Sequence, residues 1–273
     1  MSREVKKVFH MIEETNKGIC MIFGAGERVS QERIGRACFI PQREGSDERE
    51  PVTAFSVNKL RTAADLVIAA DGGMDWIREE VPELKPDIFI GDMDSVRSGD
   101  DRGAEGTITV VRLPVEKDDT DMGAAVALGL KRGYKTFYIY GGTGGRWDHT
   151  IANLQLLKHI AKNGGTGFLI GPKLTATVVY ADEDGADTVV IRGGDPSMGI
   201  NGRPFSLFGM GTAEGVTIRD AKYETTDVTL NDDYALGVSN ETTGLYTVIR
   251  FAKGTLLIIG EFLPCDIAFD NLF

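Results

Sequence analysis

Aspartates follow four short apolar runs of the sequence, and they are the side chains with the clearest capacity for chemistry. They are Asp71 after Leu-Val-Ile-Ala-Ala, Asp92 and Asp94 after Ile-Phe-Ile-Gly, Asp118, Asp119 and Asp121 after Thr-Val-Val-Arg-Leu-Pro, and Asp148 after Phe-Tyr-Ile-Tyr and a glycine-rich segment. Carboxylates at close range raise one another's pKa and need cations to balance them. Magnesium suits such a group because it prefers hard oxygen ligands and leaves positions for phosphate oxygens. We therefore expect Asp92 and Asp94 to share a magnesium ion, with Asp121 and Asp148 as the next candidates.

Each aspartate motif taken alone also has a plain structural explanation. Asp-x-Asp pairs such as Asp92 and Asp94 are common on acidic surfaces, and aspartates at 118 to 121 suit the cap and dipole of a following helix. Four such motifs at four strand ends favour the functional interpretation.

The segment Gly-Gly-Thr-Gly-Gly-Arg-Trp-Asp-His at 141 to 149 combines an open backbone with reactive side chains. Glycines let backbone N–H groups approach a polyphosphate, and the N-terminus of a helix starting near Asp148 adds further donors. Arg146 offers a planar fork that matches phosphate oxygens. The segment lacks the Gly-Lys-Ser/Thr ending of a Walker A loop. For Trp147 we expect packing in preference to stacking on a nucleobase.

Short apolar runs alternate with helix-like segments up to about residue 180, which predicts a parallel sheet covered on both faces. The expected strands are 19–23, 66–70, 88–90, 108–112, 137–140 and 167–170. Helices are expected from near Asp121 to Gly133 and after Asp148, where Ile151, Leu154, Leu157 and Ile160 recur at helical spacing. Ligands of such sheets bind beyond the carboxyl ends of the strands, where the aspartates fall.

Beyond about residue 185 the helical period ends and short β-like runs follow one another. They are 188–192, 205–208, 216–219, 245–251 and 255–259, with Ala252-Lys253-Gly254 as a hairpin link between the last two. The expected fold class is therefore α/β: an N-terminal parallel-sheet, Rossmann-like catalytic domain over residues 1–182, followed by a C-terminal all-β sandwich domain over 183–273.

Composition narrows the possible partners and the cellular location. The chain of 273 residues carries a formal net charge of −11, which disfavours binding to nucleic acid or to an anionic membrane. Its three cysteines are too far apart for a zinc knuckle or a redox pair. We find neither a signal-peptide core nor an apolar run of membrane-spanning length, so we expect a soluble, cytoplasmic protein.

With these motifs in order, the chain resembles the thiamine pyrophosphokinase family. The resemblance runs from about residue 19 to 260, through Ala-Asp-Gly-Gly at 70–73, Gly-Asp-Met-Asp-Ser at 91–95, Asp-Asp-Thr-Asp at 118–121, the segment 141–149 and Gly-Val-Ser-Asn-Glu at 237–241. It implies transfer of the pyrophosphoryl group of ATP to the hydroxyl of thiamine, giving thiamine diphosphate and AMP. It also implies a homodimer with its sites at the subunit interface.

The resemblance assigns roles to residues of this sequence by their position in the motifs. Asp92, Asp94 and Asp121 correspond to Mg²⁺ ligands and, with Asp148, form the catalytic set. The ATP-binding set is Asp71, Gly72, Gly73, Gly142, Thr143, Gly144, Gly145 and Arg146, and the thiamine-binding set is Asp118, Thr120, Tyr223, Ser239 and Asn240. Tyr223 stands where some members of the family carry tryptophan, and an ordinary strand aromatic is an equal interpretation of it.

Two other functions share these sequence features. A pyrophosphokinase for another hydroxymethyl acceptor, such as a pterin, would keep the aspartates and need a different acceptor pocket. A non-catalytic thiamine or nucleotide sensor would keep the pocket, but it would not require all four acidic positions.

Overall fold

The structure is a computed structural model that describes residues 18–37, 64–91, 108–112, 119–182, 185–194 and 202–269. The chain separates into two compact units, one formed by Gly18–Pro172 and the other containing Lys173–Phe273. We describe each unit by itself.

The N-terminal unit is built on a parallel sheet. Its strands are β1 (Ile19–Phe23), β2 (Ala64–Ala70), β3 (Ile88–Gly91), β4 (Thr109–Arg112), β5 (Thr136–Tyr140) and β6 (Thr166–Ile170). They are ordered β6-β5-β1-β2-β3-β4, and every neighbouring pair runs parallel. β1 lies between β2 and β5 and all five of its residues are buried, because both faces of a central parallel strand are covered.

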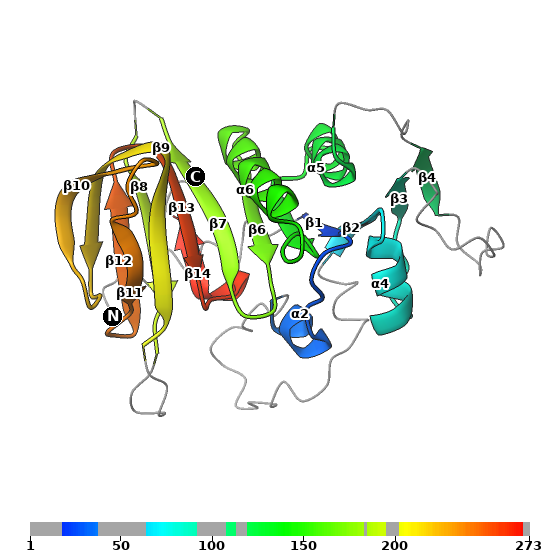
Figure 1. The fold of residues 1–273 in the computed structure, drawn as a ribbon, viewed down its shortest axis with the longest axis horizontal. Helices are drawn as coiled ribbons and strands as arrows, with labels where there is room; N and C mark the ends of the chain where they lie inside the picture. The colour runs from blue at the N-terminus through cyan, green and yellow to red at the C-terminus, as the bar shows by residue number, and fades with distance from the viewer. Residues whose placement is uncertain are drawn as a thin grey trace. The chain divides into compact units, whose positions relative to one another are not determined.

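Helices pack against this sheet (Figure 1). They are α2 (Gln31–Ala37), α4 (Gly73–Glu80), α5 (Asp121–Lys131) and α6 (Trp147–Lys162). α4 and α5 contact β1 and β2, whereas α6 contacts β6 and α5. Of the predicted apolar stripe on α6, Leu157 and Ile160 are buried but Ile151 is 57% exposed. Among the described residues, every helix is too short or too polar to traverse a bilayer.

The described part of the C-terminal unit contains antiparallel strands and no α-helix. The strands are β7 (Thr175–Ala181), β8 (Asp187–Arg192), β9 (Pro204–Arg219), β10 (Thr225–Asn231), β11 (Gly237–Glu241), β12 (Tyr246–Phe251), β13 (Lys253–Gly260) and β14 (Ile267–Phe269), with a 3₁₀ turn, η2, at Pro264–Asp266. Their order is β14-β8-β12-β9-β13-β7, and β10 and β11 also pair with β9.

β9 differs from the sequence prediction, which had two separate runs at 205–208 and 216–219. The structure has one curved strand of 16 residues (Figure 1). Gly211 and Gly215 have φ angles of +90° and +70°, which only glycine adopts freely, so the strand bends without ending. β13 pairs along 205–214 and β12 pairs along 217–219. The predicted hairpin at Ala252-Lys253-Gly254 is wrong: Ala252 alone separates β12 from β13, and both strands pair with β9, which lies between them.

Candidate active site

Three loops gather at the carboxyl ends of the central strands of the parallel sheet. They follow β1 at 24–27, β2 at 71–73 and β5 at 141–145. After β1 the chain moves to β2 on one side, and later to β5 on the other, so the strand order reverses at this point. Crevices at such reversals are the usual ligand sites of parallel sheets. The structure therefore places the predicted segments 71–73 and 141–145 at a favourable edge.

The loop after β1 is a part of this edge that sequence reasoning missed. The Gly24 N–H donates to the Tyr140 carbonyl at 2.8 Å, the Gly26 N–H to the Gly141 carbonyl at 2.8 Å and the Glu27 N–H to the Thr143 carbonyl at 2.7 Å. A Cβ on Gly26 would lie 2.5 Å from the Thr143 carbonyl oxygen, so glycine is required for this approach. The sequence signal was Gly-Ala-Gly directly after a strand.

Asp71 is held in an unusual backbone conformation at the end of β2. Its φ is +50°, which is uncommon for a residue other than glycine, and its N–H donates to the Ile90 carbonyl of β3 at 2.8 Å. α4 begins two residues later, so the N-terminus of a helix faces the same edge. Strained residues of this kind cluster at functional sites, and Asp71 is one of the predicted nucleotide ligands.

A buried aromatic cluster lies beneath the three loops. Phe23 ends β1, Tyr140 ends β5 and Trp76 belongs to α4. The ring centroids of Phe23 and Tyr140 are 5.0 Å apart, and those of Phe23 and Trp76 are 5.3 Å apart. Contacts of these aromatic rings fix the spacing between the loops that follow them.

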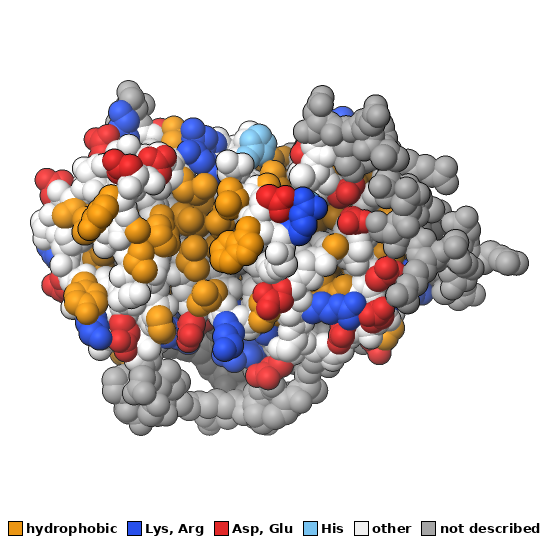
Figure 2. All heavy atoms as spheres, viewed as in Figure 1, with side chains coloured by type: hydrophobic (Ala, Val, Ile, Leu, Met, Phe, Trp, Pro, Cys, Tyr) orange, Lys and Arg blue, Asp and Glu red, His pale blue; other side chains and the backbone are white. Residues whose placement is uncertain are grey.

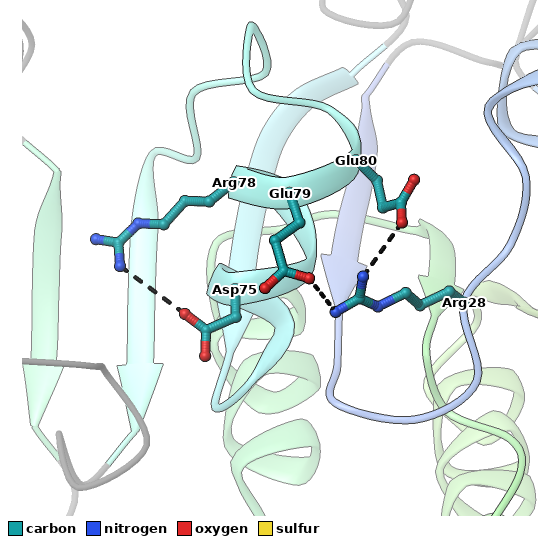
Figure 3. Close-up of polar contacts among 5 residues, drawn as sticks. All are labelled: Arg28, Asp75, Arg78, Glu79 and Glu80. Carbon is teal, nitrogen blue, oxygen red and sulfur yellow. Dashed lines mark hydrogen bonds and ion pairs between the residues drawn. The ribbon is translucent and has the colours of Figure 1, made fainter.

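Ion pairs tie the segment after the first loop to α4 (Figure 3). The Arg28 guanidinium lies 2.6 Å from the Glu79 carboxylate and 3.2 Å from that of Glu80, while Asp75 and Arg78 pair within α4 at 3.9 Å. The Gln31 side chain also donates to the Glu80 carbonyl. These partners are exposed, so we expect each pair to contribute little to stability while it limits movement of the loop.

The first turn of α5 lies against the loop that follows β1. The Thr120 Oγ1 accepts from the Gly123 N–H at 3.0 Å and caps the helix, and Asp121 lies in its first turn. A Cβ on Gly24 would lie 2.4 Å from the Met122 side chain, which shows that this turn touches the loop after β1. Asp121 belongs to the same turn and therefore lies near the loop after β1. In the described ranges no three potential ligand side chains cluster, and Asp92, Asp94 and Asp118 lie outside those ranges.

Arg146 and Asp148 form a two-point ion pair where the glycine-rich loop enters α6. The Arg146 Nε and Nη2 donate to the two carboxylate oxygens of Asp148 at 3.0 and 2.5 Å. Both side chains are exposed, and Trp147 between them is 83% exposed. The expected packing of Trp147 is thus wrong for the described part of the chain, because the first turn of α6 directs this ring to solvent.

Hydrogen bonding from Arg146 lowers the pKa of Asp148 from 3.8 to about 2. A lowered folded-state pKa means that the pair favours the folded state above the unfolded pKa near 3.8, and that this contribution disappears as the pH falls toward 2. We expect Arg146→Ala to raise the Asp148 midpoint from about 2 toward 3.8, with the His149 backbone N–H still lowering it in part, measured by carboxyl ¹³C NMR titration. An unchanged midpoint would show that Arg146 does not set this acidity.

Thr143 contributes a buried hydroxyl to the glycine-rich loop. Its Oγ1 has no hydrogen-bond partner among the described residues. Next to it, the Asn153 Nδ2 donates to the Gly142 carbonyl at 2.7 Å, which explains why a polar residue of α6 is buried. A buried hydroxyl without a partner is costly, so a bound ligand oxygen would satisfy it.

Three residues predicted to bind thiamine lie close together in the C-terminal unit: Tyr223, Ser239 and Asn240. The Asn240 side chain hydrogen-bonds the backbone of Tyr223, and Ser239 has a φ of +62°. Tyr223 as a residue is 60% exposed and belongs to a unit whose surface carries hydrophobic side chains among charged ones (Figure 2). Exposed aromatic rings beside a buried polar anchor suit a flat ligand.

Comparison with known proteins adds independent information. The family described as "Thiamin pyrophosphokinase, catalytic domain" matches residues 57–168. Thiamine pyrophosphokinase 1 of Oryza sativa subsp. japonica is 30% identical over 118 residues, in a match that covers 34% of this chain and 43% of the rice protein. Thiamine pyrophosphokinase of Bacillus subtilis is 28% identical over 171 residues, covering 62% of this chain and 76% of that protein.

Solved structures of two thiamine pyrophosphokinases have a fold similar to that of this chain. The Bacillus subtilis thiamine pyrophosphokinase superposes with a TM-score of 0.67 at 22% identity, covering 90% of this chain and 99% of that chain. The yeast enzyme superposes with a TM-score of 0.63 at 14% identity, covering 96% and 91% of the two chains.

Proposed function

We propose that the chain, whose residues 57–168 match the thiamin pyrophosphokinase family, transfers the pyrophosphoryl group of ATP to the hydroxyl of thiamine, giving thiamine diphosphate and AMP. The observation that carries the proposal is the joining of the loops after β1 and β5 by backbone hydrogen bonds, at the strand-order reversal and beside Asp71. Such a transfer needs positioning and charge stabilisation more than covalent chemistry.

The nucleotide is proposed to bind across these loops. Backbone N–H groups of 142–145 and 72–73, with the Arg146 guanidinium, would contact phosphate oxygens. Arg146 is engaged with Asp148 in the structure, so ATP would have to share or replace that partner. The Thr143 hydroxyl supports the proposal because it lies in this loop without a partner among the described residues.

Mg²⁺ is proposed to be held by Asp92, Asp94 and Asp121. The donor set consists of carboxylates, which magnesium prefers, and the position of Asp121 at the start of α5 is compatible with it. When bound, the ion would neutralise charge on the phosphate oxygens. Asp121 or Asp148 is proposed to accept the hydroxyl proton.

The residues proposed to contact thiamine are Asp118, Thr120, Tyr223, Ser239 and Asn240. We further propose a cytoplasmic homodimer with its sites at the subunit interface. Each chain would contain the Rossmann-like catalytic domain and β-sandwich domain of the sequence prediction, which divides them near residue 182, ten residues beyond the division of the compact units after Pro172. The exposed Tyr234, Leu236 and Leu245 supply apolar surface that suits subunit contact.

The proposed reaction is tested by ³¹P NMR of the purified protein with ATP, thiamine and magnesium, omitting each component in turn. We expect thiamine-dependent formation of AMP and thiamine diphosphate in equal amounts and no ADP. ADP with thiamine monophosphate would replace the proposal by a simple kinase. AMP formed only with a pterin alcohol, or saturable thiamine binding without AMP, would establish one of the two alternatives.

A further inference from the structure

The turn between β9 and β10 is attached to the end of β11 by a short antiparallel ladder. Ala221 and Thr242 form a β-bridge, and the Lys222 N–H donates to the Glu241 carbonyl at 2.9 Å. Continued by one step, the ladder would bring Tyr223 opposite the backbone of Asn240. Its geometry therefore decides where the Tyr223 ring projects.

The backbone of Asn240 pairs elsewhere. Asn240 is in register with Phe205 of β9, after an irregularity that begins at Gly237. Within that irregularity Ser239 has a φ of +62° and donates its N–H to the Ser206 hydroxyl at 3.1 Å. At Asn240 the main chain of β11 therefore pairs with β9 and does not supply hydrogen-bond partners for the backbone of Tyr223.

The side-chain amide of Asn240 takes the place of the missing peptide group. Its Oδ1 accepts from the Tyr223 N–H at 3.0 Å, and its Nδ2 donates to the Tyr223 carbonyl at 2.8 Å. Oδ1 also accepts from the Glu241 N–H at 2.8 Å, so both of its lone-pair directions are used. This two-way bond repeats the pattern of an antiparallel ladder in a side chain.

Burial separates the functions of the two residues. Asn240 is 6% exposed, whereas Tyr223 is 60% exposed. A buried amide whose carbonyl oxygen is saturated has little capacity left for a ligand, while its bonds hold the neighbouring residue in place. The exposed ring is the part that a ligand can reach.

We propose that Asn240 is a positioning residue that acts through Tyr223: its amide fixes the backbone of Tyr223, so that the ring forms a preset platform for the flat ring of the acceptor substrate. This inference rests on the proposed function and narrows the role of Asn240 from direct contact to orientation. A preset platform improves binding because less freedom is lost when the substrate stacks.

Asn240→Asp is the sharpest substitution, because Asp keeps the shape and the acceptor oxygen but faces the Tyr223 carbonyl with a second oxygen. Steady-state AMP release is measured against thiamine at saturating MgATP and against ATP at saturating thiamine, for Asn240→Asp, Tyr223→Ala and the double variant. We expect the thiamine KM to rise about tenfold in each single variant. The ATP KM should stay within about twofold, and the double variant should be no worse than the poorer single variant.

Asn163→Asp serves as the matched control. Its amide also donates to a backbone carbonyl, that of His159 at 2.8 Å, but at the exposed end of α6. We expect normal KM values for both substrates. Thermal unfolding of all variants checks the fold, and hydrogen exchange at the Tyr223 amide in Asn240→Ala gives a readout that does not depend on activity. That amide should exchange about tenfold faster than in the wild type.

The outcomes are distinct. Multiplication of the two single effects in the double variant would show that Asn240 binds thiamine itself and would overturn the inference. An unchanged thiamine KM in Asn240→Asp, or unchanged exchange at Tyr223 in Asn240→Ala, would do the same. Absence of thiamine-dependent AMP release by the wild type would refute the proposed function first, and the inference with it.

Discussion

Replacing Asp121 by Asn is expected to lower turnover on the order of 10²- to 10³-fold while the protein stays folded. The carboxylate lies in the first turn of α5, and that turn contacts the loop after β1 through Met122 and Gly24. Asn keeps the size of the side chain but removes the negative charge that we assign to magnesium binding. Turnover is measured as AMP release with thiamine and MgATP, and folding by thermal unfolding.

Glu32→Gln is the matched control for Asp121→Asn. Glu32 is also an acidic residue in the first turn of a helix, α2, and pairs with Arg36 on an exposed surface. Each substitution removes one favourable charge from a helix N-terminus, which costs about 0.3–1 kcal/mol of stability. Similar stability losses with loss of turnover only in Asp121→Asn would support the assignment. Near-normal turnover in Asp121→Asn would reduce Asp121 to a residue that stabilises α5.

Substituting Gly73 by Ala is expected to give a large loss of stability. A Cβ at this position would lie 1.9 Å from the Phe23 carbonyl oxygen and 2.5 Å from its carbonyl carbon. These are backbone atoms at the end of β1, so α4 must move away from the strand, at a cost of about 1–3 kcal/mol or more. The same movement would displace Asp71 and the loop at 24–27, so activity should fall with stability. Thermal and urea unfolding measure the effect.

Gly244→Ala provides the comparison for Gly73→Ala. A Cβ on Gly244 meets no atom within 4 Å, so we expect a change within about 0.5 kcal/mol. If the two variants unfolded at the same temperature, close packing between α4 and β1 would not be the reason for glycine at position 73.

The parallel strands were predictable because buried central strands are apolar on both faces. The predicted run 19–23 is β1 itself, and the predicted runs at 66–70 and 137–140 differ from β2 and β5 only at their first residues. The resemblance inferred from the order of the motifs agrees with the family match over residues 57–168 and with the similar relatives. The apolar runs and the order of the motifs were therefore enough to predict most of the strands of the N-terminal unit.

The strands of the antiparallel unit were harder to predict from the sequence. β10 and β11 are largely exposed and contain few apolar residues, so neither stood out as a strand. β9 was divided in the prediction because its glycines interrupt the apolar pattern, although they allow the strand to bend. Pairing partners decide these elements, and pairing depends on contacts between residues distant in sequence.

The candidate site also has parts that were predictable from the sequence and parts that were not. Asp71 and the segment 142–146 were predicted from strand ends, and the structure brings them to one edge. The loop at 24–27 was missed because its function depends on the carbonyls of 140, 141 and 143, which no local pattern reveals. Asn240 was expected to touch the substrate, since its use as a substitute peptide group is visible only with Tyr223 opposite it.

The bonds between the loops after β1 and β5 have a consequence for sequence variation among related proteins. The three bonds that join the loops use main-chain atoms only, so they do not depend on the identity of the side chains at Ala25, Glu27 or Thr143. Substitutions at Ala25 or Glu27 would leave the bonded atoms in place, and Thr143 can offer its hydroxyl to a ligand while its carbonyl joins the loops. Gly26 and Gly141 have no such freedom, because a methyl group at either would meet the backbone of the opposite loop.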